Sequence, residues 1–460
     1  VEFGEKFGAA PADIEVVTRW LTSKGFEINL VYSGGMIIDF SGTAGQLRDA
    51  FQTELHNLVV HGVRHVANIR HPQIPAALAP AVVGIASLHD FLPRPMYKPR
   101  PNYTAANSSL LAVVPADLAT IYNLNPLFKA GYSGKGQTVV VIENTNVYST
   151  ADWTTFRTAF GLSTYTTGTF TQVHPAPPTG PSNCANPGVN GDDGEAILDA
   201  EYASAAIELA SCADTQTTFG GLIAVQNIIN AKTTPPAIIS ISYGECEAYN
   251  GATANAAYNA IFEQAAAEGV SVFVSSGDEG AASCDAAKAT HGINVSGFAS
   301  TPYNVAVGGT DFGDSYAGST SAYWNSTNTS AFGSAKSYIP EIPWNDSCAG
   351  SLLSSYEGYL RLRWLLQQLR RRRLFPSHRL RQRRPKQLRH RRRLHQRRRQ
   401  RHVQGLRQAH MAIPRRRSLR RRPRHSRHFP LCRQRPLGPL LRVLLFGPEE
   451  WRSSLHWRAE

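Results

Sequence analysis

The chain has 460 residues, which is long enough for two or three domains with sizeable cores. Its net charge of +14 is the sum of two parts of opposite charge. Residues 361–460 contain 32 Arg, one Lys, three Glu and no Asp, which gives +30, so residues 1–360 carry −16. No stretch has the roughly 18 consecutive apolar residues of a spanning helix, so we expect no membrane partner.

Residues 1–91 predict a small α+β domain. Val16, Val17, Trp20 and Leu21 stand at helical spacing, and Gly25 ends that helix. The expected order is helix, strand, strand, helix and strand, over 13–24, 26–31, 36–40, a stretch capped by Thr43, and 59–69. This order fits a ferredoxin-like domain with one strand lost upstream, and the absence of Met and of a signal peptide at Val1 agrees.

Residues 92–110 are a Pro-rich linker that we expect to be exposed and easily cut. From 111 to 357 the pattern alternates short apolar runs with helical stretches, which predicts an α/β domain with a parallel sheet. The expected strands cover 139–142, 237–241, 270–274 and 305–307, and the expected helices cover 195–210, 222–231 and 253–268.

The composition of residues 358–460 is not typical of a folded domain. Arg, Leu, Gln, Pro and His make up 74 of the last 100 residues, and Asp, Asn, Tyr and Thr are absent. Codons for all five enriched residues can begin with C, so the composition indicates that a GC-rich gene is translated in a shifted reading frame here. We expect this tail to have no ordered structure. The alternative is a true Arg-rich tail, which would bind polyanions through its charge. We expect no specific nucleic-acid partner.

Six cysteines are scattered along the chain, and none forms a CxxC pair, which argues against zinc. In a Lys-poor, Ser/Thr/Asn-rich chain they favour disulfides and an extracellular, secreted protein, although buried thiols remain open for each. Four of them precede Cys348 and allow three pairings: Cys184, Cys212, Cys246 and Cys284.

Two acidic features point to chemistry. Glu195 and Asp199 are four residues apart, so on a helix both carboxylates share one face and repel each other. Taken alone, the pair also fits an ordinary acidic helix start. Asp278 follows the buried run 270–274 within a Gly-flanked segment, and such strand ends line the crevice of open α/β sheets.

These segments, together with Ser242-Tyr243-Gly244 and Gly308-Gly309-Thr310, resemble the sedolisin family of serine-carboxyl peptidases. Residues 1–91 are similar to its pro-kumamolisin activation domain, and the resemblance extends in order over about 1–357. It implies a subtilisin-like fold, a parallel sheet with helices on both faces, whose C-terminal part is lost here.

The resemblance also implies site roles. Glu195 would be the general base, Asp199 would orient it, and Asp278 would stand protonated in the oxyanion hole. A Ser-His-Asp site is the weaker hypothesis, because His174 and His291 are the only histidines between 102 and 360. The residues implied to line the substrate cleft are Ser242, Tyr243, Gly244, Ser276 and Gly277.

We therefore expect a secreted endopeptidase zymogen that acts on proteins or peptides at acid pH, as a monomer inhibited by its own propeptide. The family nucleophile lies in a Gly-Thr-Ser motif, and none follows residue 350. Calcium is expected for the family, but its C-terminal site is lost here, so we name no metal ligand. The chain as written is expected to be inactive. The alternatives are an inhibitor-like module that keeps only propeptide binding, or polyanion binding through the tail.

Cys246 and Cys284 are expected to form a disulfide. Each lies shortly after a strand that carries one of the family segments, so both should sit near the same edge of the cleft. A Cα separation above about 7 Å would exclude the bond.

The composition break makes a prediction about the gene. Read in another frame after about codon 350, the DNA is expected to encode a Gly-Thr-Ser motif followed by an acidic, Gly-rich loop. Resequencing the gene and translating all three frames checks this. If neither other frame restores a globular sequence, the frameshift interpretation is wrong.

Overall fold

The computed structural model describes residues 2–60, 62–95, 113–204, 206–278, 283–284, 294–343 and 440–445. Val1–Leu353 and Cys432–Glu460 belong to one compact unit, and Ser354–Leu431 to another that lies outside the described residues. Most of the linker 92–110, the stretch 344–357 and all but six residues of the tail 358–460 also fall outside them. Among the described residues, no helix is long and apolar enough to cross a membrane.

The N-terminal domain is α+β, as predicted. Helices α2 and α3 cover one face of its sheet through Val17, Leu21, Leu47 and Phe51, which pack with Phe40 of β2 in a self-contained core. Thr43 caps α3 in a capping box with Gln46. The elements are α1 (Glu2–Phe7), α2 (Pro11–Ser23), β1 (Glu27–Val31), β2 (Ile37–Gly42), α3 (Ala44–Phe51), β3 (Leu55–Val60), β4 (Val63–Asn68), β5 (Gly84–Ala86) and β6 (Arg94–Pro95).

Two features of this domain differ from the prediction. The single strand expected over 59–69 is a hairpin of β3 and β4, because the chain reverses at Gly62, whose φ of +85° favours glycine. Strand β16 (Leu440–Leu445), from the tail expected to lack order, pairs antiparallel with both β2 and β5. The resulting sheet has the order β1-β2-β16-β5.

The second domain is built on a six-stranded sheet of order β13-β12-β10-β7-β9-β8. Every pairing in it is parallel, which confirms the predicted α/β class. Its strands are β7 (Thr138–Glu143), β8 (Phe170–Val173), β9 (Ala206–Ser211), β10 (Ile238–Ile241), β12 (Ser271–Ser275) and β13 (Val305–Val307).

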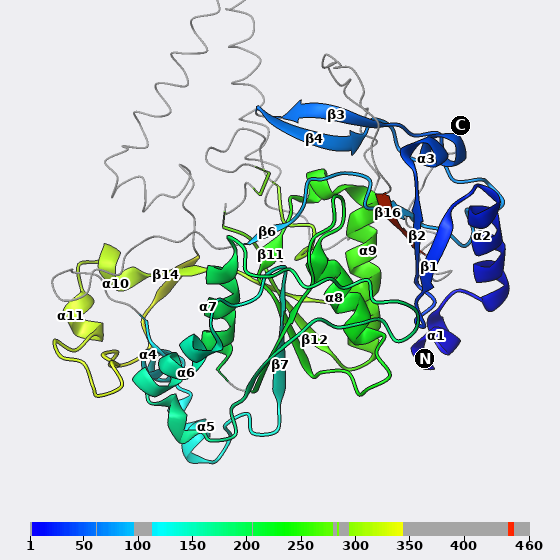
Figure 1. The fold of residues 1–460 in the computed structure, drawn as a ribbon. Coiled ribbons are helices and arrows are strands. Elements are labelled where there is room, and N and C mark those ends of the chain that lie inside the picture. The colour runs from blue at the N-terminus through cyan, green and yellow to red at the C-terminus, as the bar shows by residue number, and fades with distance from the viewer. Residues whose placement is uncertain are drawn as a thin grey trace, which may run out of the picture. The chain divides into compact units, whose positions relative to one another are not determined.

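Helices cover both faces of this sheet (Figure 1). On β7, Val140 and Ile142 pack into the core that contains α8 (Gly220–Ile229) and α9 (Glu247–Ala267), whereas Val141 packs into the core of α6 (Thr150–Ala159) and α7 (Asp193–Ala203). This alternation is the period of two that a strand imposes. Helix α8 is buried along its whole length, which explains its almost entirely apolar sequence.

The helix predicted over 195–210 is only half correct. Helix α7 ends at Ala203, with Ser204 in a left-handed conformation, and the next residues form the central strand β9. Ile207 and Leu209 of β9 are buried in the core beside α7, and the strand pairs with β7 and β8. An apolar run this short suits helix or strand equally, so the pairing decided the outcome.

A smaller cluster joins the start of the second domain to its last described part. Ile121, Trp324 and Ile339 form its core, and the buried carboxylate of Asp117 accepts hydrogen bonds from the backbone N–H groups of Val114, Ser334 and Ala335. The remaining elements are α4 (Pro115–Ile121), α5 (Asn125–Lys129), a 3-10 turn (Leu162–Thr164), β11 (Tyr243–Gly244), β14 (Thr310–Phe312), α10 (Gly313–Tyr316), α11 (Thr320–Tyr323) and β15 (Glu341–Pro343).

Two disulfides are present among the described cysteines. Cys246–Cys284 has a Cα separation of 4.9 Å, which confirms the pairing expected from sequence. Cys184–Cys212 ties the loop before α7 to the end of β9, also with a Cα separation of 4.9 Å. Both bonds hold loops at the same end of the sheet, where strands β9 and β10 finish.

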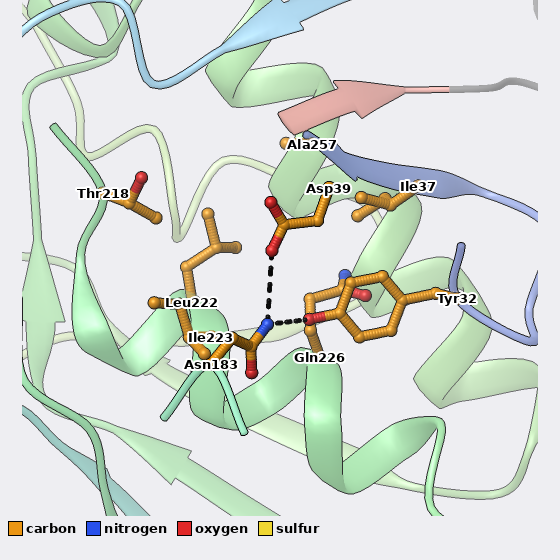
Figure 2. A pocket seen from close by; sticks show the side chains of 9 residues that line it. All are labelled: Tyr32, Ile37, Asp39, Asn183, Thr218, Leu222, Ile223, Gln226 and Ala257. Carbon is orange, nitrogen blue, oxygen red and sulfur yellow. Dashed lines mark hydrogen bonds between the residues drawn. The ribbon is translucent and has the colours of Figure 1, made fainter. Parts of the chain in front are cut away.

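The N-terminal domain shares a hydrophobic core with α8 and α9, which includes Met36 and Ile37, and it also contacts the second domain through polar side chains (Figure 2). Asn183 Nδ2 donates to Tyr32 Oη at 2.9 Å and to Asp39 Oδ2 at 3.3 Å, and the Tyr32 hydroxyl donates to Asn227 of α8. The cavity between these side chains has about 20 Å³, which is the room that a single water needs and too little for a peptide side chain. The docking surface is therefore closed and is not a substrate site.

Asp117 offers a test of the cluster that closes the second domain. Asp117→Ala leaves three buried N–H donors without their acceptor, so the free energy of unfolding should fall by about 3 kcal/mol. Urea denaturation followed by circular dichroism measures the loss. The exposed Asp13→Ala should cost less than about 0.5 kcal/mol, and an equal loss in both variants would contradict the role of Asp117.

Candidate active site

Three strands deliver side chains to one edge of the parallel sheet. Strand β7 ends on Glu143, β10 is followed by Ser242, and β12 is followed by Ser276, Gly277 and Asp278. Because β7 and β12 both pair in parallel with β10, their carboxyl ends lie together. Polar groups at such an edge are the usual lining of a crevice in open α/β folds.

Helix α7 brings the predicted pair to this edge. It begins after Asp192, whose carbonyl accepts the Glu195 N–H, so Glu195 lies in the first turn and is 4 % exposed. Asp199 lies one turn later and accepts the Ser242 hydroxyl at 2.7 Å. In the same crevice, Glu195 Oε2 is buried and has no hydrogen-bond partner within the described ranges.

Both carboxyls of the pair favour their protonated forms. Burial, and next to it the charge of Asp199, raise the pKa of Glu195 to about 8; a hydrogen bond from Ser242 opposes the shift, and Asp278 and Asp192 add smaller contributions. Burial likewise raises the pKa of Asp199 to about 6, although the hydrogen bond from Ser242 opposes the shift. Since the two groups interact, they titrate as a pair, with Asp199 ionising first.

Asp278 lies close enough to the pair for its charge to contribute to the raised pKa of Glu195. Gly277, just before it, has a φ of +106°, a conformation that L side chains rarely adopt. The glycine therefore allows the chain to turn sharply after β12 and present Asp278. Ser276, whose N–H donates to the Val307 carbonyl, completes the turn beside β13.

A third buried acid, which was not predicted from the sequence, lies at the same edge. Glu143 is fully buried at the end of β7, and burial together with the charge of Asp199 raises its pKa well above the ordinary value. The Tyr243 hydroxyl lies 2.8 Å from Glu143 Oε2 and 3.0 Å from Asn144 Oδ1. An acid that ends an apolar run was the signal that singled out Asp278, and it also marks Glu143.

Asn144 extends the network away from the crevice. Its amide nitrogen donates to Asp214 Oδ2, and Asp214 Oδ1 accepts the Gly220 N–H at 2.7 Å, at the start of α8. A carboxylate at that helix N-terminus is favoured by the helix dipole. The path therefore joins Tyr243 at the crevice to the helix on which the N-terminal domain docks.

A segment of the chain itself lies against the strand that is predicted to bind substrate. Strand β6 pairs antiparallel with β11, with Pro95 opposite Tyr243 and Arg94 opposite Gly244. The chain that leaves the N-terminal domain thus forms a short β-ladder with two of the residues predicted to bind substrate. Adding a strand to an exposed edge is a common way to bind extended peptides.

The described residues offer no donor set for a metal ion. No three His, Cys, Asp or Glu side chains within them come together in a way that could hold one.

Comparisons with known proteins agree with this architecture. Residues 1–91 match the family model of the pro-kumamolisin activation domain. The chain is 28 % identical to kumamolisin of Bacillus sp. (strain MN-32) over 319 residues, which cover 67 % of the chain and 55 % of kumamolisin. It is 30 % identical to sedolisin of Pseudomonas sp. (strain 101) over 341 residues, covering 71 % of the chain and 56 % of sedolisin.

A solved structure, Pseudomonas sedolisin, a serine-carboxyl proteinase, complexed with two molecules of pseudo-iodotyrostatin, also matches. It has a TM-score of 0.37 and 26 % identity, over 52 % of this chain and 60 % of that one. The protein is thus a peptidase homologue with an activation domain. Its activation domain is of the pro-kumamolisin type, and about two thirds of the chain is similar to peptidases of the sedolisin family. The chain spans about half the length of the curated relatives it matches.

The raised pKa of Glu195 predicts how stability depends on pH. A carboxyl whose pKa rises from 4.5 to about 8 on folding costs nothing below pH 4.5 and destabilises the fold increasingly up to about pH 8. Glu195→Gln should therefore leave stability nearly unchanged at pH 4 and increase it by on the order of 2 kcal/mol at pH 8 to 9. Chemical denaturation at both pH values measures the difference.

The exposed Glu27→Gln is the matched control, and it should alter stability by less than about 0.5 kcal/mol at either pH. A Glu195→Gln variant that is equally stabilised, or destabilised, at both pH values would show that Glu195 is not buried as described.

Proposed function

We propose that this protein is a secreted endopeptidase zymogen that cleaves proteins or peptides at acid pH, and that the chain as written is inactive. The observation that carries the proposal is the antiparallel pairing of β6 with β11, directly beside Ser242 and the carboxyl pair. It supports a linker that occupies the cleft as a substrate would, which makes the N-terminal domain an intramolecular inhibitor.

The proposed chemistry is acyl transfer with a carboxylate base. In the complete enzyme a serine hydroxyl would donate to Glu195, pass its proton to that carboxylate and attack the peptide carbonyl. Asp199 would hold Glu195 in place, and a protonated Asp278 would donate to the developing oxyanion. The buried Glu195 Oε2, which has no partner within the described residues, suits the acceptor role in this step.

The acid optimum needs a further condition. With a pKa of about 8, Glu195 is protonated at acid pH and accepts no proton. Because burial is the main cause of that shift, removing β6 from the cleft should admit water and lower the pKa of the pair. Cleavage of the linker would then switch on the base as well as open the cleft.

The missing nucleophile fits an incomplete second domain. Strand β13 pairs only with β12 among the described residues, and its apolar residues Val305 and Val307 are each 49 % exposed. Phe273 of β12 is 36 % exposed. A core strand of an α/β fold is normally covered on both faces, so we attribute this surface to the absence of the element that carries the Gly-Thr-Ser motif.

An inhibitor module is the second candidate. The N-terminal domain has a hydrophobic core of its own, and it docks on the second domain through both apolar and polar side chains. A chain without a nucleophile that keeps this domain would retain the binding function alone. This candidate would be favoured if neither the chain as written nor a frame-corrected chain cleaves peptides, and the chain inhibits a related peptidase.

The two proposals separate in a peptide-hydrolysis assay from pH 3 to 8. The chain as written should be inactive, and a frame-corrected chain should be active with an optimum below about pH 5. Glu195→Gln in the corrected chain should lower kcat by at least about 100-fold, because the base is lost.

Activity of the uncorrected chain that survives Glu195→Ala would overturn the proposed mechanism, as would a corrected enzyme that works best at pH 8. Glu27→Gln in the corrected chain is the control for expression and folding, and it should leave kcat unchanged.

A further inference from the structure

A histidine anchors the segment that leads from the N-terminal domain into the linker strand. His89 lies just after β5, and its ring nitrogen Nε2 is 3.2 Å from the carbonyl oxygen of Asn250 in the first turn of α9. Two residues later, Phe91 stacks on Tyr249 of the same helix, with ring centroids 5.9 Å apart. Strand β6 begins at Arg94 and pairs with β11. The anchor therefore lies directly before the part of the linker that occupies the cleft.

The contacts of His89 require a neutral imidazole. A carbonyl oxygen only accepts hydrogen bonds, so Nε2 carries the hydrogen and Nδ1 is unprotonated. Nδ1 is buried and has no hydrogen-bond partner within the described residues. Protonation would place a charge and an unpaired donor at this buried atom. Burial accordingly lowers the pKa of His89, although the Asn250 carbonyl and the charge of Asp90 oppose the shift.

We propose that His89 is an acid-sensitive latch for the linker: when its imidazole is protonated, the segment 89–95 leaves α9 and β6 separates from β11, while the rest of the N-terminal domain stays docked on α8. This deepens the proposed function, because it rests on the linker occupying the cleft. A histidine whose pKa is lower in the docked state costs docking nothing well above pH 6.5. It weakens docking increasingly as the pH falls below 6.5, until the docked imidazole is protonated too.

The charged groups near His89 leave this response in place. Its titratable neighbours are Asp90 on its own segment, His65 on β4, and Glu247 and Tyr249 at the start of α9. Asp90 Oδ1 lies 3.0 Å from His65 Nδ1, and the charge of Asp90 offsets only part of the effect of burial on His89.

The other end of the docking surface responds to pH in the opposite sense. Asp39 of β2 is 2 % exposed and accepts hydrogen bonds from Asn29 and Asn183. Burial raises the pKa of Asp39, so a falling pH favours its docked form. Tyr32 beside it also has a raised pKa and stays neutral at acid pH. Acid should therefore open the linker end and leave the contact with α8 in place.

The experiment is amide hydrogen exchange of the full chain, followed by mass spectrometry from pH 7.5 to 4.5 and corrected for the intrinsic exchange rate at each pH. Peptides that cover 92–95 and 243–247 should exchange at least about fivefold faster at pH 4.5 than at pH 7.5. The peptide that covers 33–35 should change by less than about twofold. It reports on the α8 end, because the Gly34 N–H donates to Asn230 Oδ1 at 2.8 Å.

His89→Gln separates the latch from a merely structural contact. Glutamine keeps a neutral N–H donor for the Asn250 carbonyl and does not titrate in this range, so the acid-induced increase should disappear. His56→Gln is the matched control, since His56 lies on β3 of the same domain, 3.0 Å from Glu54, and the increase should remain. If His89→Gln does not fold, His89→Asn, another neutral amide, takes its place.

An increase that persists in the folded His89 variant, or that is lost in His65→Gln instead, would overturn the proposal, as would equal opening at both ends of the docking surface. The exchange needs no enzymatic turnover. A frame-corrected chain that opens its linker at acid pH but cleaves no peptide would therefore keep the latch and reject the proposed peptidase activity.

Discussion

Burying several acids in one crevice is the constraint on which the site depends. Glu143, Glu195 and Asp199 meet where β7 and β10 end, and each charge raises the cost of ionising its neighbours. The fold offsets this cost with donors from elements that are already fixed: the Ser242 hydroxyl for Asp199 and the Tyr243 hydroxyl for Glu143. The acids can remain together only while these strands and α7 hold their positions.

The same strands connect the crevice to the docked N-terminal domain. Tyr243 is linked through Asn144 and Asp214 to the start of α8, and Asn227, two turns further along α8, accepts the Tyr32 hydroxyl. The loop that holds Asn183 against Tyr32 and Asp39 is tied to β9 by the disulfide of the next residue, Cys184. The docking contacts of the N-terminal domain and the acidic crevice are therefore linked through one network of hydrogen bonds and a disulfide.

Much of this arrangement could be predicted from sequence. Short apolar runs located β7, β10 and β12, and the helical spacing of Glu195 and Asp199 placed both acids on one face of α7. Strand β9 was mistaken for helix because its short run carries no periodicity of its own and is decided by pairing with β7 and β8. Glu143 was missed because a single acid at a strand end is common, and its importance comes from neighbours that are distant in sequence. The β6–β11 ladder has no sequence signal, since it joins segments about 150 residues apart.

The outer strand β13 has a consequence for the cell that makes this chain. Within the described residues β13 pairs along one side only and exposes apolar side chains, and a strand of that kind can act as a template for further strands. Molecules that end their folding in this state would recruit one another through that edge and form fibrous or amorphous deposits. Chaperones and proteases that recognise exposed apolar strands would compete with this assembly, so the amount of soluble product would be set by quality control more than by synthesis.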